Sequence, residues 1–336
     1  MAKLFEPFKL KNLELRNRIV LSPMCQYQAM NENGIPESWH LIHYVSRAIG
    51  GTGLIMTEMT NVEPNGRITE HCLGLYSDEQ EDAFKGINHE IHKYGAKSAI
   101  QIAHAGRKSK IMEGDIVAPS AIPFSSDYRV PKELTIDDIQ KIIQMFASSA
   151  KRAVRANFDA IELHGAHGYL LHQFISKASN QRKDRYGDPT LFSKEVIEAV
   201  KSEMPSGMPL IMRVSAIEYT NQSYTLSEMI NYTGVFIQAG VDMFDVSTGG
   251  NSPNKPDIFP GYQAGFAKSI KESLNIPVIS VGNLGIPEVA EHVVKSNYAD
   301  LVSIGKGMLK DPYWAKTAAM KLNVQLEMPG VYELGY

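Results

Sequence analysis

The sequence predicts an α/β fold: a closed (β/α)8 barrel of the TIM type, with an N-terminal β-hairpin that closes its bottom. The chain has 336 residues and contains eight short apolar runs rich in β-branched residues, each followed by a segment of helical periodicity. Eight strand–helix units are typical of a closed parallel barrel. The expected strands are Arg18–Met24, Gly53–Met59, Lys97–His104, Asp159–Gly165, Pro209–Ser215, Met243–Thr248, Pro277–Gly282 and Leu301–Gly305.

Helix signals follow each of these runs. Capping boxes are expected where Thr135 precedes Asp138 and where Thr225 precedes Glu228. An open doubly wound sheet is the alternative, but it usually carries a glycine-rich G-x-G-x-x-G turn after its first strand, and this chain has CQYQAM there. The segment Leu4–Leu15 is expected to form the hairpin. The expected helices are Trp39–Ile49, Asp78–Tyr94, Ile136–Ala156, Leu191–Glu203, one opened by Thr225, Ala264–Leu274, Pro287–Lys295 and Asp311–Leu322.

Composition narrows the class of protein. With 43% hydrophobic and 21% charged residues, the chain can build one large core, and we expect a single domain over residues 1–336. A net charge of −3 argues against nucleic-acid binding, which needs clustered Lys and Arg. No apolar run is long enough to span a bilayer, and the N-terminus lacks an apolar signal core. Two cysteines cannot build a disulfide framework, so we expect a cytoplasmic protein with reduced thiols.

Polar and cationic residues stand at the ends of six of the expected strands. In a parallel barrel these ends converge on one mouth, where catalytic groups are found. The sequence therefore predicts a site built from Ser22, Pro23, Met24, Cys25 and Tyr27 after the first strand, Gln101 and His104 on the third, His164, His167 and Tyr169 after the fourth, Arg213 on the fifth, Gly282 after the seventh, and Gly305 and Lys306 after the eighth.

Glycines follow the seventh and eighth strands, at the usual phosphate site of this architecture. Gly282 and Gly305 would let backbone N–H groups approach an anion, and Lys306 would add positive charge. Glycines at strand ends can also be simple turn formers. The pattern predicts a phosphorylated ligand, and a non-redox barrel enzyme acting on a sugar phosphate or similar small molecule would share it.

His164 and His167 lie three residues apart at a strand end, with Tyr169 close behind. Metal binding by this pair is disfavoured, because no carboxylate or further histidine stands at a conventional spacing; His172 lies in a helix expected to point elsewhere. Two imidazoles can donate hydrogen bonds to an oxygen that gains negative charge, and a tyrosine can deliver a proton. The alternative is that both histidines only cap the strand.

At these residues the sequence resembles the old yellow enzyme family, in particular its bacterial subclass with a cysteine beside the flavin. The likeness covers nearly the whole chain, up to the final tyrosine, and rests on motifs in the same order: SPMCQY, QIAHAGRK, IELHGAHGYLLHQF followed by SNQRKDRYG, MRVSA and FPGYQ. The resemblance implies FMN as cofactor and NADPH or NADH as hydride donor. It further implies ping-pong hydride transfer through flavin N5 to the C=C bond of α,β-unsaturated carbonyl or nitro compounds.

The resemblance also implies individual roles. Ser22, Pro23, Met24 and Cys25 would line the flavin, Met59 would touch its ring, Gln101 would bind its pyrimidine end, and Arg213 would stabilise the anionic reduced form. Gly282, Gly305 and Lys306 would hold the phosphate. His164 and His167 would bind the substrate oxygen, Tyr169 would donate the proton, Tyr27 would add a hydrogen bond to the ligand, and Lys108 would play a supporting part.

Two departures from the family pattern concern FMN and assembly. Lys306 stands where the family usually has arginine, and lysine lacks the bidentate fork that grips a phosphate. Leu334 stands where the subclass often has an arginine that reaches into the neighbouring subunit. The family implies a homodimer or homotetramer. Its larger iron–sulfur branch is excluded by the presence of only two cysteines, and Glu58 and Lys108 are the only candidates for the acid, base or Schiff-base residue of a non-redox barrel.

Overall fold

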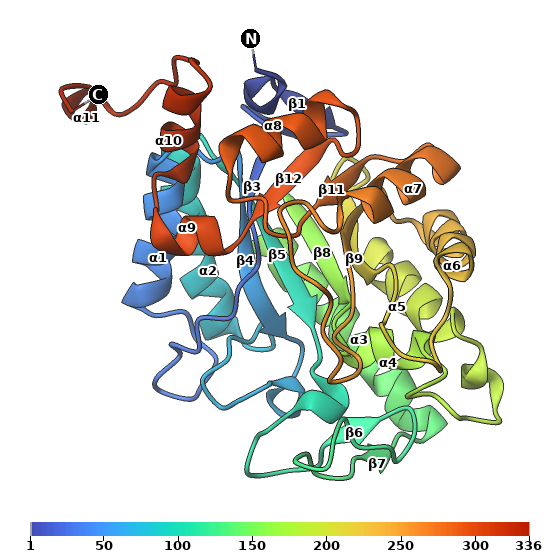
Figure 1. Ribbon diagram of the computed structural model, residues 1–336. Helices are drawn as coiled ribbons and strands as arrows, with labels where there is room; N and C mark the ends of the chain where they lie inside the picture. The colour runs from blue at the N-terminus through green and yellow to red at the C-terminus, as the bar shows by residue number, and fades with distance from the viewer. Residues whose placement is uncertain (1, 336) are drawn as a thin grey trace.

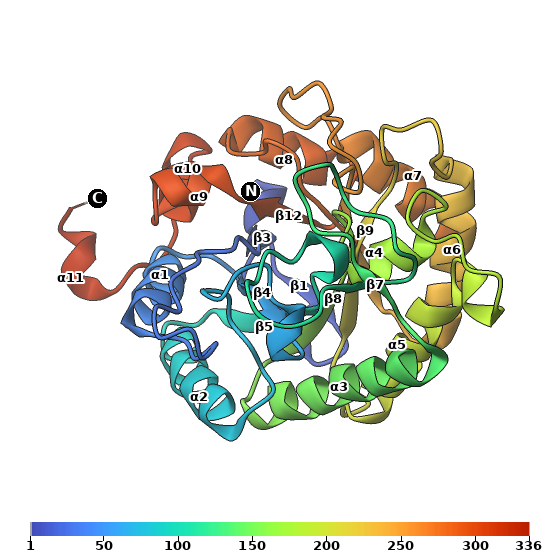
Figure 2. The same cartoon turned by 90° about the horizontal axis from the view of Figure 1, so that it is seen from below.

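The computed structural model describes residues 2–335 as a closed barrel of eight parallel strands with helices around it; Met1 and Tyr336 lie outside the described residues. The strands follow one another around the barrel in chain order, and the last pairs with the first, as Figures 1 and 2 show. This confirms the predicted fold class. The barrel strands are β3 (Ile19–Leu21), β4 (Leu54–Asn61), β5 (Lys97–Ala103), β8 (Ala160–Gly165), β9 (Leu210–Ser215), β10 (Met243–Ser247), β11 (Val278–Ser280) and β12 (Leu301–Ile304).

The helices between the strands form the outer ring, because each carries apolar residues that pack toward the strands, whereas α11 lies away from the barrel and has no buried residues. Both expected capping boxes are present, with the Thr135 and Thr225 hydroxyls accepting from the N–H groups three residues on. Among residues 2–335, none of the helices combines the length and the apolar character needed to cross a membrane. The helices are α1 (Ser38–Ile49), α2 (Asp78–Lys93), α3 (Ile136–Arg155), α4 (Leu170–Ile175), α5 (Leu191–Ser202), α6 (Leu226–Ala239), α7 (Ala264–Leu274), α8 (Pro287–Lys295), α9 (Lys306–Lys310), α10 (Trp314–Lys321) and α11 (Gly330–Glu333).

The bottom of the barrel is closed by the hairpin of β1 (Phe8–Leu10) and β2 (Leu13–Leu15), as expected from the sequence. Leu13 and Leu15 are buried and belong to one cluster with inward-facing residues of the barrel strands. Because strand side chains alternate between faces, each barrel strand supplies one inward-facing residue to this cluster, and β4 supplies two, Leu54 and Met56. Together these inward-facing residues form one layer, which comprises Val20, Leu54, Met56, Ala99, Ala160, Ile211, Met243, Ile279 and Leu301.

Two element boundaries differ from the expectation by three residues, and others differ by one or two. The first strand ends at Leu21 rather than Met24, because Pro23 has no N–H with which to continue the ladder. The expected helix Asp311–Leu322 is shorter, since α9 ends before Asp311 and α10 begins at Trp314. Asp311 lies just before this second helix and accepts hydrogen bonds from the Tyr313 N–H at 2.8 Å and the Thr317 hydroxyl at 2.6 Å.

The hairpin should contribute measurably to stability. Leu13→Ala removes a side chain that is only 1% exposed, so we expect the free energy of unfolding to fall by about 2–5 kcal/mol. Lys9→Ala on the exposed face of the same hairpin is the matched control and should change stability little. Urea unfolding followed by far-ultraviolet circular dichroism measures both. Equal stability of the two variants would contradict a stabilising role of the hairpin at the bottom of the barrel.

Candidate active site

Two adjoining cavities occupy the carboxyl end of the barrel and share Met24 and Arg213 in their linings. The first, of about 360 Å³, is lined by eleven residues, all from the segments named by the sequence. The second, of about 640 Å³, contains Gly282, Gly305 and Lys306. The structure thus brings the predicted site residues together, His104 excepted, which binds Glu63 instead. The first cavity is lined by Ser22, Pro23, Met24, Cys25, Tyr27, Met59, Gln101, His164, His167, Tyr169 and Arg213.

A tight turn after β8 makes the histidine–tyrosine cluster. His167 and Gly168 both take the left-handed conformation, with φ of 57° and 75°. The Tyr169 N–H donates to the Ala166 carbonyl at 3.2 Å and closes the turn. The chain therefore reverses, and the ring centroid of His164 lies 5.1 Å from that of His167 and 4.8 Å from that of Tyr169.

The proton of His164 can be located from its hydrogen bond. Its Nδ1 accepts from the Ala166 N–H at 3.3 Å, so the neutral ring carries its proton on Nε2. Burial, followed by the positive charge of Arg213, holds the pKa of His164 well below its usual value. The same two causes lower the pKa of His167, whose Nε2 lies 2.7 Å from the Ser247 hydroxyl. Both imidazoles are therefore neutral at pH 7.

Tyr169 is a protonated phenol at neutral pH. Its pKa is raised well above the usual value, first by burial and then by the nearby Cys25 and Tyr27. The ammonium of Lys108 lies 5.1 Å from the centroid of the Tyr169 ring. An acid that keeps its proton and faces a cavity can protonate a strong carbon base formed next to it.

Cys25 and Tyr27 follow β3 and also line the first cavity. Burial and the charge of Glu58 raise the pKa of Cys25 well above its usual value, so the thiol stays protonated. Glu58 accepts from the Gln26 N–H at 2.8 Å and from the Tyr44 hydroxyl at 3.0 Å. Burial raises the pKa of Glu58 to about 7. Glu58 therefore anchors this loop to α1 and does not line either cavity.

Lys108 is also committed elsewhere. Its Nζ donates to the His167 carbonyl at 2.9 Å and to the Gly250 carbonyl at 3.1 Å, and it too is outside both cavity linings. The two residues that a non-redox barrel would have used are thus structural. Within residues 2–335, no group of three or more His, Cys, Asp or Glu side chains could hold a metal ion.

Beneath the first cavity lies a buried polar layer that the sequence analysis missed in part. The Gln101 amide donates to Glu162 Oε1 at 2.7 Å, and Arg213 Nε lies 3.2 Å from Asp245 Oδ2. Glu162 Oε2 and Asp245 Oδ1 have no hydrogen-bond partner. Glu162 could have been found from its position two residues before His164, which places both on the inward face of β8.

The second cavity has the chemistry of an anion site. Its lining contains Arg213, Lys306 and Lys310, and within the described chain it includes no carboxylate. Gly282 has φ of 118°, a backbone conformation that residues with a side chain rarely adopt, so glycine is favoured there. The second cavity is cationic, the first contains neutral hydrogen-bond donors, and Arg213 lines both. Together they fit a ligand with a phosphate tail in the second cavity and a planar ring in the first.

This fold and this site define a class: parallel-barrel oxidoreductases that bind a phosphorylated flavin across the mouth. Comparison with known proteins agrees. The family model described as "NADH:flavin oxidoreductase / NADH oxidase family" matches residues 3–325. The chain belongs to this family, which confirms the resemblance drawn from its motifs. It is therefore an oxidoreductase whose cofactors are FMN and a reduced nicotinamide.

Curated relatives match over their whole length. The chain is 46% identical to the NADPH dehydrogenase of Listeria innocua, with 99% of this chain and 98% of the relative covered. It is 44% identical to the NADPH dehydrogenase of Bacillus licheniformis, with 98% of each covered. The NADPH dehydrogenase of Clostridium acetobutylicum is 42% identical, with 99% of each covered.

Solved structures give the same picture. Morphinone reductase in complex with tetrahydroNAD is 27% identical and has a TM-score of 0.81, with 97% of this chain and 92% of that chain covered. A 2-naphthoyl-CoA reductase complex has a TM-score of 0.90 at 23% identity and is similar in fold alone. The match covers 95% of this chain but 52% of that one, so the chain spans about half its length.

The carboxylate layer should make stability depend on pH. Burial, then the charge of Asp245, raises the pKa of Glu162 from 4.5 to about 8. The folded protein then holds a proton that the unfolded chain has released, so stability is full below pH 4.5 and is lost as the pH rises through about 8. Glu162→Gln cannot titrate and should flatten this dependence in denaturant unfolding between pH 5 and 8. An unchanged slope would show that the proton resides elsewhere.

Proposed function

We propose that the chain is an FMN-dependent ene reductase, which uses NADPH or NADH to reduce the C=C bond of α,β-unsaturated carbonyl or nitro compounds. The proposal rests on one observation: two neutral imidazoles and a protonated phenol face the same cavity, with ring centroids 4.8 and 5.1 Å apart. This set can bind an activating oxygen and deliver a proton beside it. The redox chemistry itself comes from FMN, when bound, as a hydride carrier.

Each residue has a part in this proposal. His164 donates from Nε2 to the carbonyl or nitro oxygen, and His167 joins it, so that electron density leaves the β-carbon. Tyr169 gives its phenolic proton to the α-carbon. Tyr27 contacts the ligand from the side of Cys25. No charged imidazole is needed, because hydrogen-bond donors stabilise developing negative charge without changing protonation state.

The remaining residues hold the cofactor. Arg213 lies at the junction of the two cavities, where its charge favours an anionic reduced ring, and Gln101 binds the pyrimidine end. Ser22, Pro23, Met24, Cys25 and Met59 line the ring. Gly282, Gly305 and Lys306 receive the phosphate.

NADPH is the proposed hydride donor, supported by the names of the relatives from Listeria and Bacillus. We further propose one domain, a cytoplasmic location and a homodimer or homotetramer. Unpaired Cys25 and Cys72 suit a reducing compartment. Exposed apolar side chains on α1 and the C-terminal arm, which extends from the barrel in Figure 1, suit self-association; they are Trp39, Ile42, Val331 and Leu334. Sedimentation velocity tests the assembly.

Replacing the proton donor should separate the two half-reactions. Tyr169→Phe keeps the ring but loses the acid, so we expect reoxidation of the reduced flavoprotein by cyclohexenone to slow by about 10²-fold or more. Reduction by NADPH should stay within about twofold, since it needs no proton from this residue. Anaerobic stopped-flow absorbance measures both steps, and Tyr298→Phe on the outer surface is the control. Equal slowing of both half-reactions would contradict the role of Tyr169.

The lysine at the anion end should set the affinity for FMN. Lys306→Arg restores a bidentate fork and should tighten FMN binding, whereas Lys306→Gln should weaken it by about tenfold through loss of one charge-assisted hydrogen bond. Fluorescence titration of the apoprotein with FMN and with riboflavin measures the difference. Riboflavin has no phosphate, so its binding should not distinguish the variants; a parallel change for both ligands would contradict the phosphate site.

A further inference from the structure

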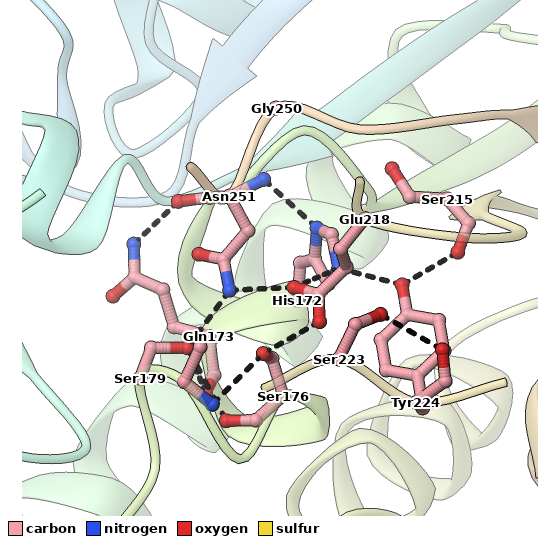
Figure 3. Close-up of polar contacts among 12 residues, drawn as sticks. His172, Gln173, Ser176, Ser179, Ser215, Glu218, Ser223, Tyr224, Gly250 and Asn251 are labelled. Atoms are coloured by element: carbon pink, nitrogen blue, oxygen red, sulfur yellow. Dashed lines mark hydrogen bonds and ion pairs between the residues drawn. The ribbon is translucent and has the colours of Figure 1, made fainter. Parts of the chain in front are cut away.

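His172 is a buried histidine that the two cavities do not use. It lies on α4, directly after the turn that carries His167 and Tyr169, and its side chain is fully buried. Figure 3 shows it at the centre of a polar cluster drawn from the loops after three different strands. The cluster comprises His172, Gln173, Ser176, Ser179, Ser215, Glu218, Tyr224 and Asn251.

The hydrogen bonds of His172 fix which nitrogen carries the proton. The Tyr224 hydroxyl donates to the Ser215 carbonyl at 2.6 Å, so its oxygen is left to accept from His172 Nε2 at 2.7 Å. Glu218 Oε1 also faces Nε2, at 3.2 Å. Nε2 is therefore the protonated nitrogen, and Nδ1 accepts from the Gly168 N–H at 2.9 Å. His172 thus holds the peptide that joins His167 to Gly168.

Glu218 connects this histidine to the loop after β10. It accepts from the Asn251 amide at 2.7 Å and from the Ser176 hydroxyl at 2.8 Å. Burial by itself raises the pKa of Glu218, but hydrogen bonds from His172, Asn251 and Ser176 bring it below the usual value, so the carboxylate is charged. Arg107 holds the other side of Asn251, donating to its backbone and side-chain oxygens at 2.8 and 2.9 Å.

The turn and the β10 loop are in backbone contact. A Cβ on Gly168 would come 2.4 Å from the Gly250 carbonyl, and one on Gly250 would come 2.5 Å from His167 Cα. Lys108 donates to the carbonyls of both His167 and Gly250. No side chain fits between the two segments, so a small shift in either one moves the other.

From these contacts we propose that His172 is a positioning residue, whose Nδ1 sets the place of the His167–Tyr169 turn while Glu218 ties that turn to Asn251. The inference rests on the proposed function, because what it positions is the proposed proton donor. His172 itself touches neither cavity. It acts on the reaction through the Gly168 peptide, so its effect depends on an acceptor at one particular atom rather than on volume or charge.

Two substitutions distinguish the role of Nδ1 of His172 from the role of the rest of its ring. In His172→Asn the side-chain oxygen takes the place of Nδ1 and can accept from Gly168. In His172→Gln the terminal nitrogen takes the place of Nε2 and no acceptor remains near Gly168. We expect His172→Gln to slow reoxidation by cyclohexenone on the order of 10–100-fold, the effect of a small misplacement of a catalytic group. His172→Asn should recover most of that loss.

A readout that does not depend on turnover is hydrogen exchange, measured by mass spectrometry on the flavin-loaded protein. Peptides covering residues 166–171 should exchange faster in His172→Gln and at the original rate in His172→Asn. Tyr224→Phe, which keeps the shape but loses the acceptor for Nε2, should shift exchange in the same direction as His172→Gln and serves if His172→Gln does not fold. His92→Gln alters a histidine–carboxylate pair remote from the mouth, 2.7 Å from Asp159, and is the control.

Combining His172→Gln with Tyr169→Phe tests whether His172 acts on the reaction through Tyr169. If it does, His172→Gln adds little further loss to the alkene step once the phenol is gone. Equal behaviour of the Asn and Gln variants, in rate and in exchange, would overturn the positioning role. If Tyr169→Phe alone left the alkene step unchanged, the proton donor would be wrong, and the exchange data would still decide the role of His172.

Discussion

The rest of the site depends on two successive left-handed residues, His167 and Gly168, at the end of β8. Without that reversal the chain would carry the second imidazole and the phenol away from His164. A non-glycine residue in this conformation raises the free energy of the folded state, and contacts around the turn must offset that strain. Here Lys108 and Gln173 hold the carbonyls of His167 and Gly168, and His172 holds the N–H of Gly168.

Electrostatics of the mouth follow from burial. Burial lowers the pKa of His164 and of His167, and the positive charge of Arg213 is the next largest cause. Both imidazoles are therefore neutral. The charge of Arg213 is compensated from below by Asp245, while Glu162 is left with a raised pKa. This polar layer therefore separates the first cavity from the apolar layer below it. The two imidazoles and the phenol above it are neutral hydrogen-bond donors.

Much of this could be predicted from the sequence because strands buried on both faces read as apolar runs, and all eight runs proved to be strands. The site residues were predictable for a second reason: the carboxyl ends of all strands in a parallel barrel meet at one mouth. The short helix α9 was missed, because its five residues were interpreted as part of the loop after the eighth strand, and α10 begins three residues later than expected, after Pro312. The partnership of His172 with Glu218 was also beyond prediction, since it joins loops after different strands and has no fixed spacing.

The hairpin at the bottom of the barrel bears on where ligands bind. Leu13 and Leu15 pack against the lowest layer of barrel side chains, and both cavities of the site lie at the opposite end of the barrel. In the proposed function, the nicotinamide and the compound that receives its electrons would both reach the flavin from this end.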